Sequence, residues 1–205
     1  MKSIFSIVFF FFVFSLLAQI KTTFPLSLLI VPEKTNFEKT STYSDVMSFL
    51  KAIKELSPNI SLHTIGKSTS GLDIPMAVLA NPMISNADQA KASGKPVVYI
   101  QANIHAGEVE GKEVAMMLMR DILLGDKMDL LKNQIIIFVP IYNVDGNDKM
   151  EKGLRASQEN SPLETGTREN GQGLDLNRDG VKMERQIGIK INICLFVTYK
   201  RYNLI

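Results

Sequence analysis

Two continuous apolar segments constrain the fold of this chain more than any other feature. They are PVVYIQAN at residues 96–103 and QIIIFVPI at residues 134–141. Successive side chains of a strand point to opposite faces of the sheet, so an unbroken apolar run predicts a strand that is buried on both faces. Residues 111–124 lie between them and show a helical pattern, with Val114, Leu118 and Ile122 on one side. Strands separated by a helix predict an α/β protein whose sheet contains parallel strands.

The preceding part of the chain extends this alternating pattern. Apolar residues at positions 46, 49, 50, 53 and 56 predict a helix, which Ser44 can cap and Pro58 ends. Residues 60–65 and 72–80 predict two further strands, joined by a polar turn at residues 66–71. In α/β sheets ligands gather at the carboxyl ends of strands, so the residues that follow each strand are candidate site residues.

The first 18 residues are predicted to be a targeting signal. Lys2 precedes an apolar run at residues 4–17, and Ala18 is a small residue suited to cleavage. The run is shorter than the roughly 20 residues that a membrane-spanning helix needs. We therefore expect a signal peptide at 1–18, a leader segment at 19–42, and a secreted or periplasmic protein without stable membrane association. An uncleaved membrane anchor is the alternative.

Composition excludes some functions and makes the histidines informative. The net charge is +2, and no cluster of basic residues with interleaved aromatics occurs, which argues against a nucleic-acid partner. Cys194 is the only cysteine in the sequence, so no intrachain disulfide can form. The chain has two histidines, His63 and His105. We interpret His63, within a predicted strand, as a structural or surface residue.

The turn after the first apolar segment carries a possible metal-binding pair. His105 and Glu108 are three residues apart, and the small residues Ala106 and Gly107 between them permit a tight backbone. An imidazole nitrogen and a carboxylate on such a turn can bind one metal ion, as in zinc sites that keep a position for water. The alternative for His105 is a hydrogen-bonded turn histidine.

A second polar block follows the second apolar segment. The turn begins at Asn143 and includes Asp145, and the sequence RENGQGLDLNRD then covers residues 168–179. Arg178 can hold a carboxylate through two parallel hydrogen bonds, and the neighbouring Asn177 can donate a third. A second arginine such as Arg168 can stabilise a developing oxyanion. The alternative for each arginine alone is a solvated surface residue.

Together, HAGE after a strand, then NVDG, then GLDLNRD resemble the M14 zinc carboxypeptidase family over residues 43–186. The resemblance implies an α/β/α three-layer sandwich with a mixed, mostly parallel sheet. It implies that His105 and Glu108 bind Zn2+, and that Asn177 and Arg178 bind the terminal carboxylate of a peptide or protein substrate. Arg168 matches the arginine that stabilises the oxyanion, with Arg155 as a competitor.

The chain also departs from the family's pattern. The family has a third zinc ligand, a histidine on a later strand, and a general-base glutamate later still, but no histidine follows His105. It often has an arginine at the place of Gly107. Residues 187–205 form an anomalous tail, so we expect a C-terminally truncated sandwich; a true edge strand is the alternative. The predicted function is that of a metallocarboxypeptidase, and we expect the present chain to be inactive. The alternatives are a related zinc-dependent amino-acid deacylase or a non-catalytic remnant.

Overall fold

The computed structural model describes residues 24–155 and 158–178. The predicted signal peptide at 1–18 and the tail at 187–205 lie outside these residues. The elements run in the order η1 (Leu26–Leu28), α2 (Val31–Lys34), α3 (Tyr43–Leu56), β1 (Ile60–Lys67), β2 (Asp73–Leu79), α4 (Ala87–Ala92), β3 (Val97–Gln101), α5 (Glu110–Leu124), α6 (Leu130–Asn133), β4 (Ile135–Val139), α7 (Val144–Asn147), β5 (Glu151–Lys152), β6 (Glu164–Thr165) and η2 (Leu176–Arg178).

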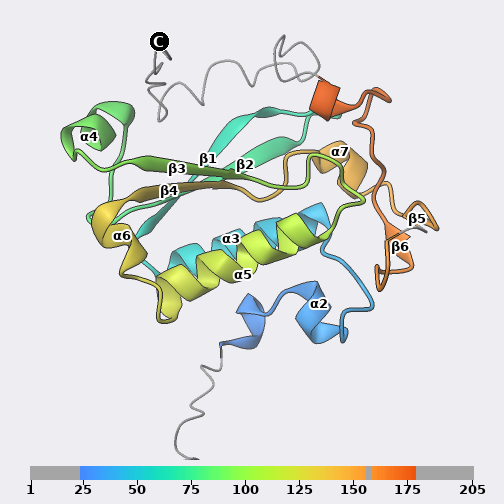
Figure 1. The fold of residues 1–205 in the computed structure, drawn as a ribbon, viewed down its shortest axis with the longest axis horizontal. Coiled ribbons are helices and arrows are strands. Elements are labelled where there is room, and N and C mark those ends of the chain that lie inside the picture. Colours follow the sequence, from blue (N-terminus) through green and yellow to red (C-terminus); the bar gives the residue numbers. More distant parts are fainter. Residues whose placement is uncertain (1–23, 156–157, 179–205) are drawn as a thin grey trace, which may run out of the picture.

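The main sheet has four strands in the order β1-β2-β4-β3 (Figure 1). β3 and β4 are parallel, with Val97 opposite Ile135 and Gln101 opposite Val139. The β1–β2 and β2–β4 pairs are antiparallel. The α/β fold with a mixed sheet that the sequence predicts is therefore confirmed. The sheet is not mostly parallel among the described strands, because β1 and β2 form a hairpin instead of alternating with helices.

Two long helices, α3 and α5, cover the same face of this sheet (Figure 1). α3 begins after Thr42, not Ser44 as predicted, because the Thr42 side chain accepts a hydrogen bond from the backbone of Asp45 and the Asp45 carboxylate accepts one from the backbone of Thr42. Its buried face consists of Val46, Phe49, Leu50 and Ile53. Among the described residues, the long helices thus form one of the two helical layers that the predicted sandwich has.

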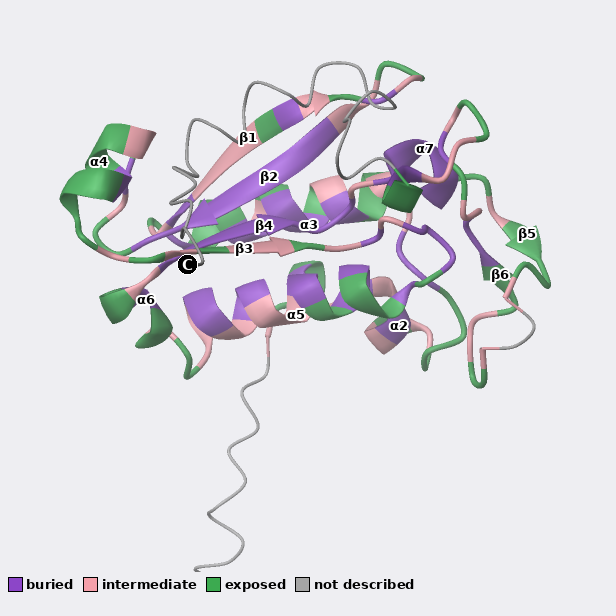
Figure 2. Cartoon of the chain, turned by 45° about the horizontal axis from the view of Figure 1, so that its top comes forward, coloured by how far each residue is buried: buried purple, intermediate pink, exposed green. Residues whose placement is uncertain are grey.

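The two apolar strands differ in burial (Figure 2). Every residue of β4 is buried, as predicted, because β4 lies between β2 and β3. In β3 no residue is fully buried, and Val98 and Gln101 are exposed, because β3 is at the edge of the described sheet. The predicted burial of both faces of β3 is therefore wrong for these residues.

The apolar face of α5 is rotated from the predicted one. Ile122 is buried, but Val114 is 57% exposed. The residues that α5 buries in the core include Ala115, Met116 and Met119. The i, i+4, i+8 spacing identified the helix correctly, but it selected a row of side chains that drifts out of the core.

Residues 24–42, which we predicted to be a leader, pack against α5. The Arg120 guanidinium bonds both carboxylate oxygens of Glu33, at 2.7 and 2.8 Å, and donates to the Leu28 carbonyl at 2.9 Å. It also stacks on the Phe24 ring, 4.3 Å from the ring centroid. Hydrogen bonding to Arg120 holds the pKa of Glu33 below its usual value. Within the part of the chain that the structure describes, no helix has the length and apolar character needed to cross a membrane.

Candidate metal centre and substrate-binding site

The polar turns after β3 and β4 lie side by side at one end of the sheet. The parallel pairing continues past the strand ends, since the Ala102 amide donates to the Val139 carbonyl at 2.9 Å. The turns themselves are then joined, because the Asn143 amide donates to the Asn103 carbonyl at 3.0 Å. The two motifs found in the sequence thus share one site because the strands that carry them are neighbours.

The turn after β3 brings His105 and Glu108 together. His105 Nδ1 lies 3.1 Å from Glu108 Oε1. The turn is tight because Asn103 adopts a positive φ of 60° and its side-chain amide donates to the Ala106 carbonyl at 3.3 Å. The His105 side chain is only 6% exposed, whereas that of Glu108 is 48% exposed. The predicted pair therefore has a fixed imidazole and a carboxylate that solvent can reach.

Asp175 fixes the other nitrogen of His105. Its Oδ1 lies 3.0 Å from His105 Nε2 and also accepts a hydrogen bond from the Asn177 amide at 2.9 Å. Burial opposes ionisation of Asp175, but the hydrogen bonds from His105, Asn177 and Arg168 outweigh it and lower its pKa to about 2. A carboxylate on one imidazole nitrogen orients the ring and leaves the other nitrogen for a metal ion. Here that other nitrogen is Nδ1, on the side of Glu108.

Asp175 belongs to the GLDLNRD motif, but the sequence pattern alone predicted no role for it. Its position two residues before Asn177 was the available signal. The contact with His105 spans 70 positions of the chain, so it could not be derived from local spacing.

Both predicted arginines of this motif meet Asp175. Arg168 contacts its Oδ2 through Nε at 3.0 Å and through Nη2 at 2.9 Å. Arg178 Nε lies 3.7 Å from the same oxygen, and its side chain is 63% exposed. Asn177 and Arg178 belong to the short helix η2 and are exposed. The site therefore has two guanidinium groups gathered around one carboxylate, which itself contacts the imidazole.

The turn after β4 holds the segment that carries Arg168 through hydrogen bonds. The Asn143 side-chain amide donates to the carbonyls of Arg168 and Glu169, at 3.2 and 3.1 Å, and its Oδ1 accepts from the Gly146 amide at 3.0 Å. Gly146 lies directly under this segment, because a Cβ there would collide with the Glu169 carbonyl. Asn143 is 1% exposed, so these bonds are shielded from water.

Asp145, in the same turn, holds the polar turn between β1 and β2. It accepts hydrogen bonds from the hydroxyls of Ser68 and Thr69, both at 2.6 Å, and from the Ser70 amide at 3.3 Å. Burial opposes its ionisation, but these bonds outweigh burial and lower its pKa. Asp145 therefore joins the turn after β4 to the turn between β1 and β2.

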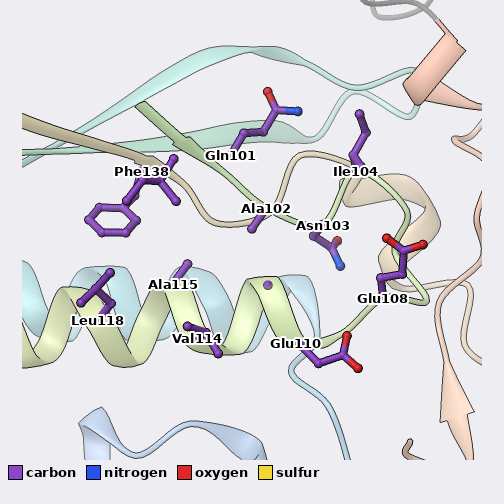
Figure 3. A pocket seen from close by; sticks show the side chains of 12 residues that line it. Gln101, Ala102, Asn103, Ile104, Glu108, Glu110, Val114, Ala115, Leu118 and Phe138 are labelled. Carbon is purple, nitrogen blue, oxygen red and sulfur yellow. The ribbon is translucent and has the colours of Figure 1, made fainter. Parts of the chain in front are cut away.

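A groove of about 510 Å3 runs between β3 and α5 and opens beside Glu108 (Figure 3). Glu108 and Glu110 lie toward one end, while Leu118 and Phe138 line the other. The exposed Val114 also lines this groove.

The described residues supply two donors that suit a metal ion, Nδ1 of His105 and the carboxylate of Glu108. Within residues 24–155 and 158–178, no group of three or more His, Cys, Asp and Glu side chains could hold a metal ion. His63 lies on β1, at the opposite edge of the described sheet from β3, where its Nε2 is 2.8 Å from Ser61 Oγ. The donor pair fits zinc in residue type, and it supplies two of the three protein ligands that a catalytic zinc site uses.

Comparison with known proteins identifies the family. The sequence profile of the zinc carboxypeptidase family matches residues 46–186. Because the match covers more than half of the 205 residues, the chain belongs to this family. Carboxypeptidase D of Homo sapiens is 28% identical over 144 residues, which are 67% of this chain and 10% of the human protein. Carboxypeptidase D of Mus musculus is 27% identical over the same share of each chain.

Solved structures agree on the fold. A putative carboxypeptidase from Burkholderia mallei has a TM-score of 0.54 at 22% identity, and the match covers 74% of this chain and 35% of that one. A putative carboxypeptidase A from Shewanella denitrificans has a TM-score of 0.54 at 21% identity, covering 75% of this chain and 36% of that one. The chain thus spans about a third of these structures and about a tenth of the curated relatives.

Proposed function

We propose that the described residues form part of the active site of a zinc metallocarboxypeptidase, which hydrolyses C-terminal peptide bonds. His105 and Glu108 are the proposed zinc ligands, Arg168 the proposed oxyanion-stabilising residue, and Asn177 and Arg178 the proposed partners of the substrate's terminal carboxylate. Membership of the family supports a peptidase. The relatives reported above are carboxypeptidases, so the deacylase alternative is not favoured.

One observation carries this proposal, namely the line of contacts Asp175–His105–Glu108. Each end is a carboxylate oxygen within 3.1 Å of a different ring nitrogen of His105. A hydrogen-bonded turn histidine needs one such partner, whereas a metal-binding histidine uses one nitrogen for orientation and the other for the metal ion. The two arginines beside Asp175 supply the positive charge that a substrate carboxylate or a developing oxyanion needs.

His105 and Glu108 would hold the zinc ion, which when bound would supply a Lewis acid for the scissile carbonyl and would lower the pKa of a bound water. The protein's own part is to position the substrate and to balance charge. Arg178, exposed on η2, can pair with a free carboxylate through two parallel N–H groups. Asn143 bonds the backbone carbonyl of Arg168, and Asp175 bonds its guanidinium. Arg168 can stabilise the negative charge that develops on the carbonyl oxygen of the substrate.

We expect zinc to bind weakly and exchange readily, since the described residues supply two ligands and catalytic zinc sites use three. For the same reason we expect no measurable peptide hydrolysis by the 205-residue chain itself. Metal analysis after dialysis against a mild chelator checks the first expectation. Stoichiometric retention of zinc would contradict it and would indicate a third ligand.

The carboxylate-binding role is tested by the binding of peptides. A short fluorescent peptide with a free C-terminus and its amidated twin are titrated with the purified chain. Arg178→Ala should weaken binding of the free-acid peptide about tenfold and leave the amidated peptide unchanged, because only the first has a carboxylate to pair. Lys132→Ala, which removes a cation from an exposed side chain, is the control. Equal losses for both peptides would refute the role assigned to Arg178.

We also propose that the chain is exported and processed, as the apolar run at residues 4–17 predicts. Mass spectrometry of the expressed protein should then show a mature N-terminus near Gln19. An intact N-terminal methionine on protein from the cytoplasm would contradict this expectation.

A further inference from the structure

Arg155 reaches the proposed metal ligands from a different part of the chain. Its Nη2 lies 3.0 Å from Glu108 Oε1, and 47 positions separate the two residues. The contact is supported nearby, because the Gln158 side-chain amide donates to Glu110 at the start of α5. The Gln158 backbone amide donates in turn to the Arg155 carbonyl at 2.9 Å. The segment that follows β5 is therefore attached twice to the turn that carries His105 and Glu108.

Gly107 leaves the space that the Arg155 side chain occupies. A Cβ at residue 107 would lie 2.7 Å from Arg155 Nε, 3.0 Å from Arg155 Cγ and 2.8 Å from the Gly166 carbonyl. No real side chain tolerates the first and last of these distances without a shift of its neighbours. The absence of a side chain at residue 107, between the two proposed ligands, thus lets the Arg155 side chain lie across the turn. Arg155 is only 22% exposed in this position.

The contact uses the Glu108 oxygen that lies closest to His105 Nδ1. Glu108 Oε1 lies 3.1 Å from His105 Nδ1 and 3.0 Å from Arg155 Nη2. A metal ion held by Nδ1 and by Glu108 would lie within a few ångströms of the guanidinium. Two cations at that separation repel each other, and the repulsion is stronger beside a partly buried side chain than in bulk water.

Arg155 could in principle help metal binding by holding the exposed Glu108 side chain in place. That benefit is limited to the conformational entropy of one carboxylate side chain. The repulsion acts on the full charge of a divalent ion and is the larger effect. We propose that Arg155 competes with the metal ion for Glu108 and so lowers the metal affinity of the site. This inference rests on the proposed role of His105 and Glu108 as metal ligands.

The test measures zinc affinity by competition with a fluorescent chelator, so it requires no catalytic activity. The purified full chain is compared with Arg155→Gln and Arg155→Ala, which remove the guanidinium. Both should bind zinc about tenfold more tightly than the wild type, as expected when one nearby positive charge is lost. Arg155→Lys keeps the charge and should stay closer to the wild type. Lys152→Ala removes a cation from β5 in the same region and is the control for net charge.

The outcomes separate this inference from the proposed function. Tighter binding in Arg155→Gln and Arg155→Ala, with Lys152→Ala unchanged, supports the competition. Unchanged or weaker binding in both Arg155 variants overturns it, even if His105→Ala confirms the metal site by losing zinc. If neither the wild type nor the Arg155 variants bind zinc in a manner that His105→Ala abolishes, both the inference and the proposed metal site are wrong.

Discussion

The turns after β3 and β4 leave neighbouring strand ends, yet they differ in nearly every physical respect. The turn after β3 presents Glu108 to solvent, with almost half of its side chain exposed. The turn after β4 forms α7, in which all four residues, Val144 to Asn147, are buried. Both turns belong to motifs that resemble the same family, but the first exposes a carboxylate to solvent, whereas the polar groups of the second bond other parts of the protein.

The partners of the second turn explain its burial. Asn143 bonds the segment at Arg168, Asp145 bonds the turn between β1 and β2, and Asn147 accepts from the buried Lys112 of α5. Three segments that are distant in sequence are thereby joined at one place. The comparison teaches that a polar motif at a strand end marks a candidate site, while burial and hydrogen-bond partners distinguish a turn that solvent can reach from one that supports its neighbours.

The largest expected effect comes from removing one charge from each turn. Asp145→Asn should lower the free energy of unfolding by about 2–3 kcal/mol, because the hydrogen bonds from Ser68, Thr69 and Ser70 lose their charged acceptor and the NH2 group replaces one of the two accepting oxygens. Glu108→Gln is the matched isosteric change and should cost less than about 1 kcal/mol, since its ion pair is half exposed. Urea unfolding measures both. Similar losses for the two variants would remove the distinction between the turns.

The sequence identified much of this site for physical reasons. The unbroken apolar runs predicted two strands, and the parallel pairing of β3 and β4 then placed the following turns together. The contact between His105 and Glu108 could be predicted from their spacing, because it depends only on the backbone of the short turn that separates them. The contact of Arg155 with Glu108 depends on a segment 47 positions away and on the space above Gly107, which local pattern does not encode.

The wrong predictions of burial also have particular causes. An apolar run does not say whether a strand is central or at an edge, so β3 and β4 were given the same burial. Val114 was grouped with Leu118 and Ile122 on one side of α5 because their spacing is helical, although the buried row runs through Ala115 and Met119. Residues 24–42 showed no strong periodicity, and their packing depends on contacts that are distant in sequence, such as the ion pair between Glu33 and Arg120 and the burial of Leu28 in the core.

A smaller effect, visible as a pH dependence, is expected from Lys112 of α5, the cation that bonds the turn after β4. Lys112 is fully buried and donates to the Ser41 carbonyl and, at 2.6 Å, to Asn147 Oδ1. Burial lowers the pKa of Lys112 to about 8, although Glu113, Asp148 and Asp45 act in the opposite direction. Above pH 8 the folded protein loses this proton while the unfolded chain keeps it, so stability rises with pH.

The rise should be about 1–2 kcal/mol between pH 8 and 9.5, measured by urea unfolding at each pH. The window ends there because burial raises the pKa of Tyr99, so stability falls once the tyrosine of the unfolded chain begins to ionise near its ordinary value. Lys112→Met should abolish the rise, whatever its effect on overall stability, and Lys132→Met, at an exposed lysine, should retain it. A rise that survives in Lys112→Met would show that another group titrates, and the buried turn would then not be bonded by a cation of lowered pKa, which is what sets it apart from the turn of His105 and Glu108.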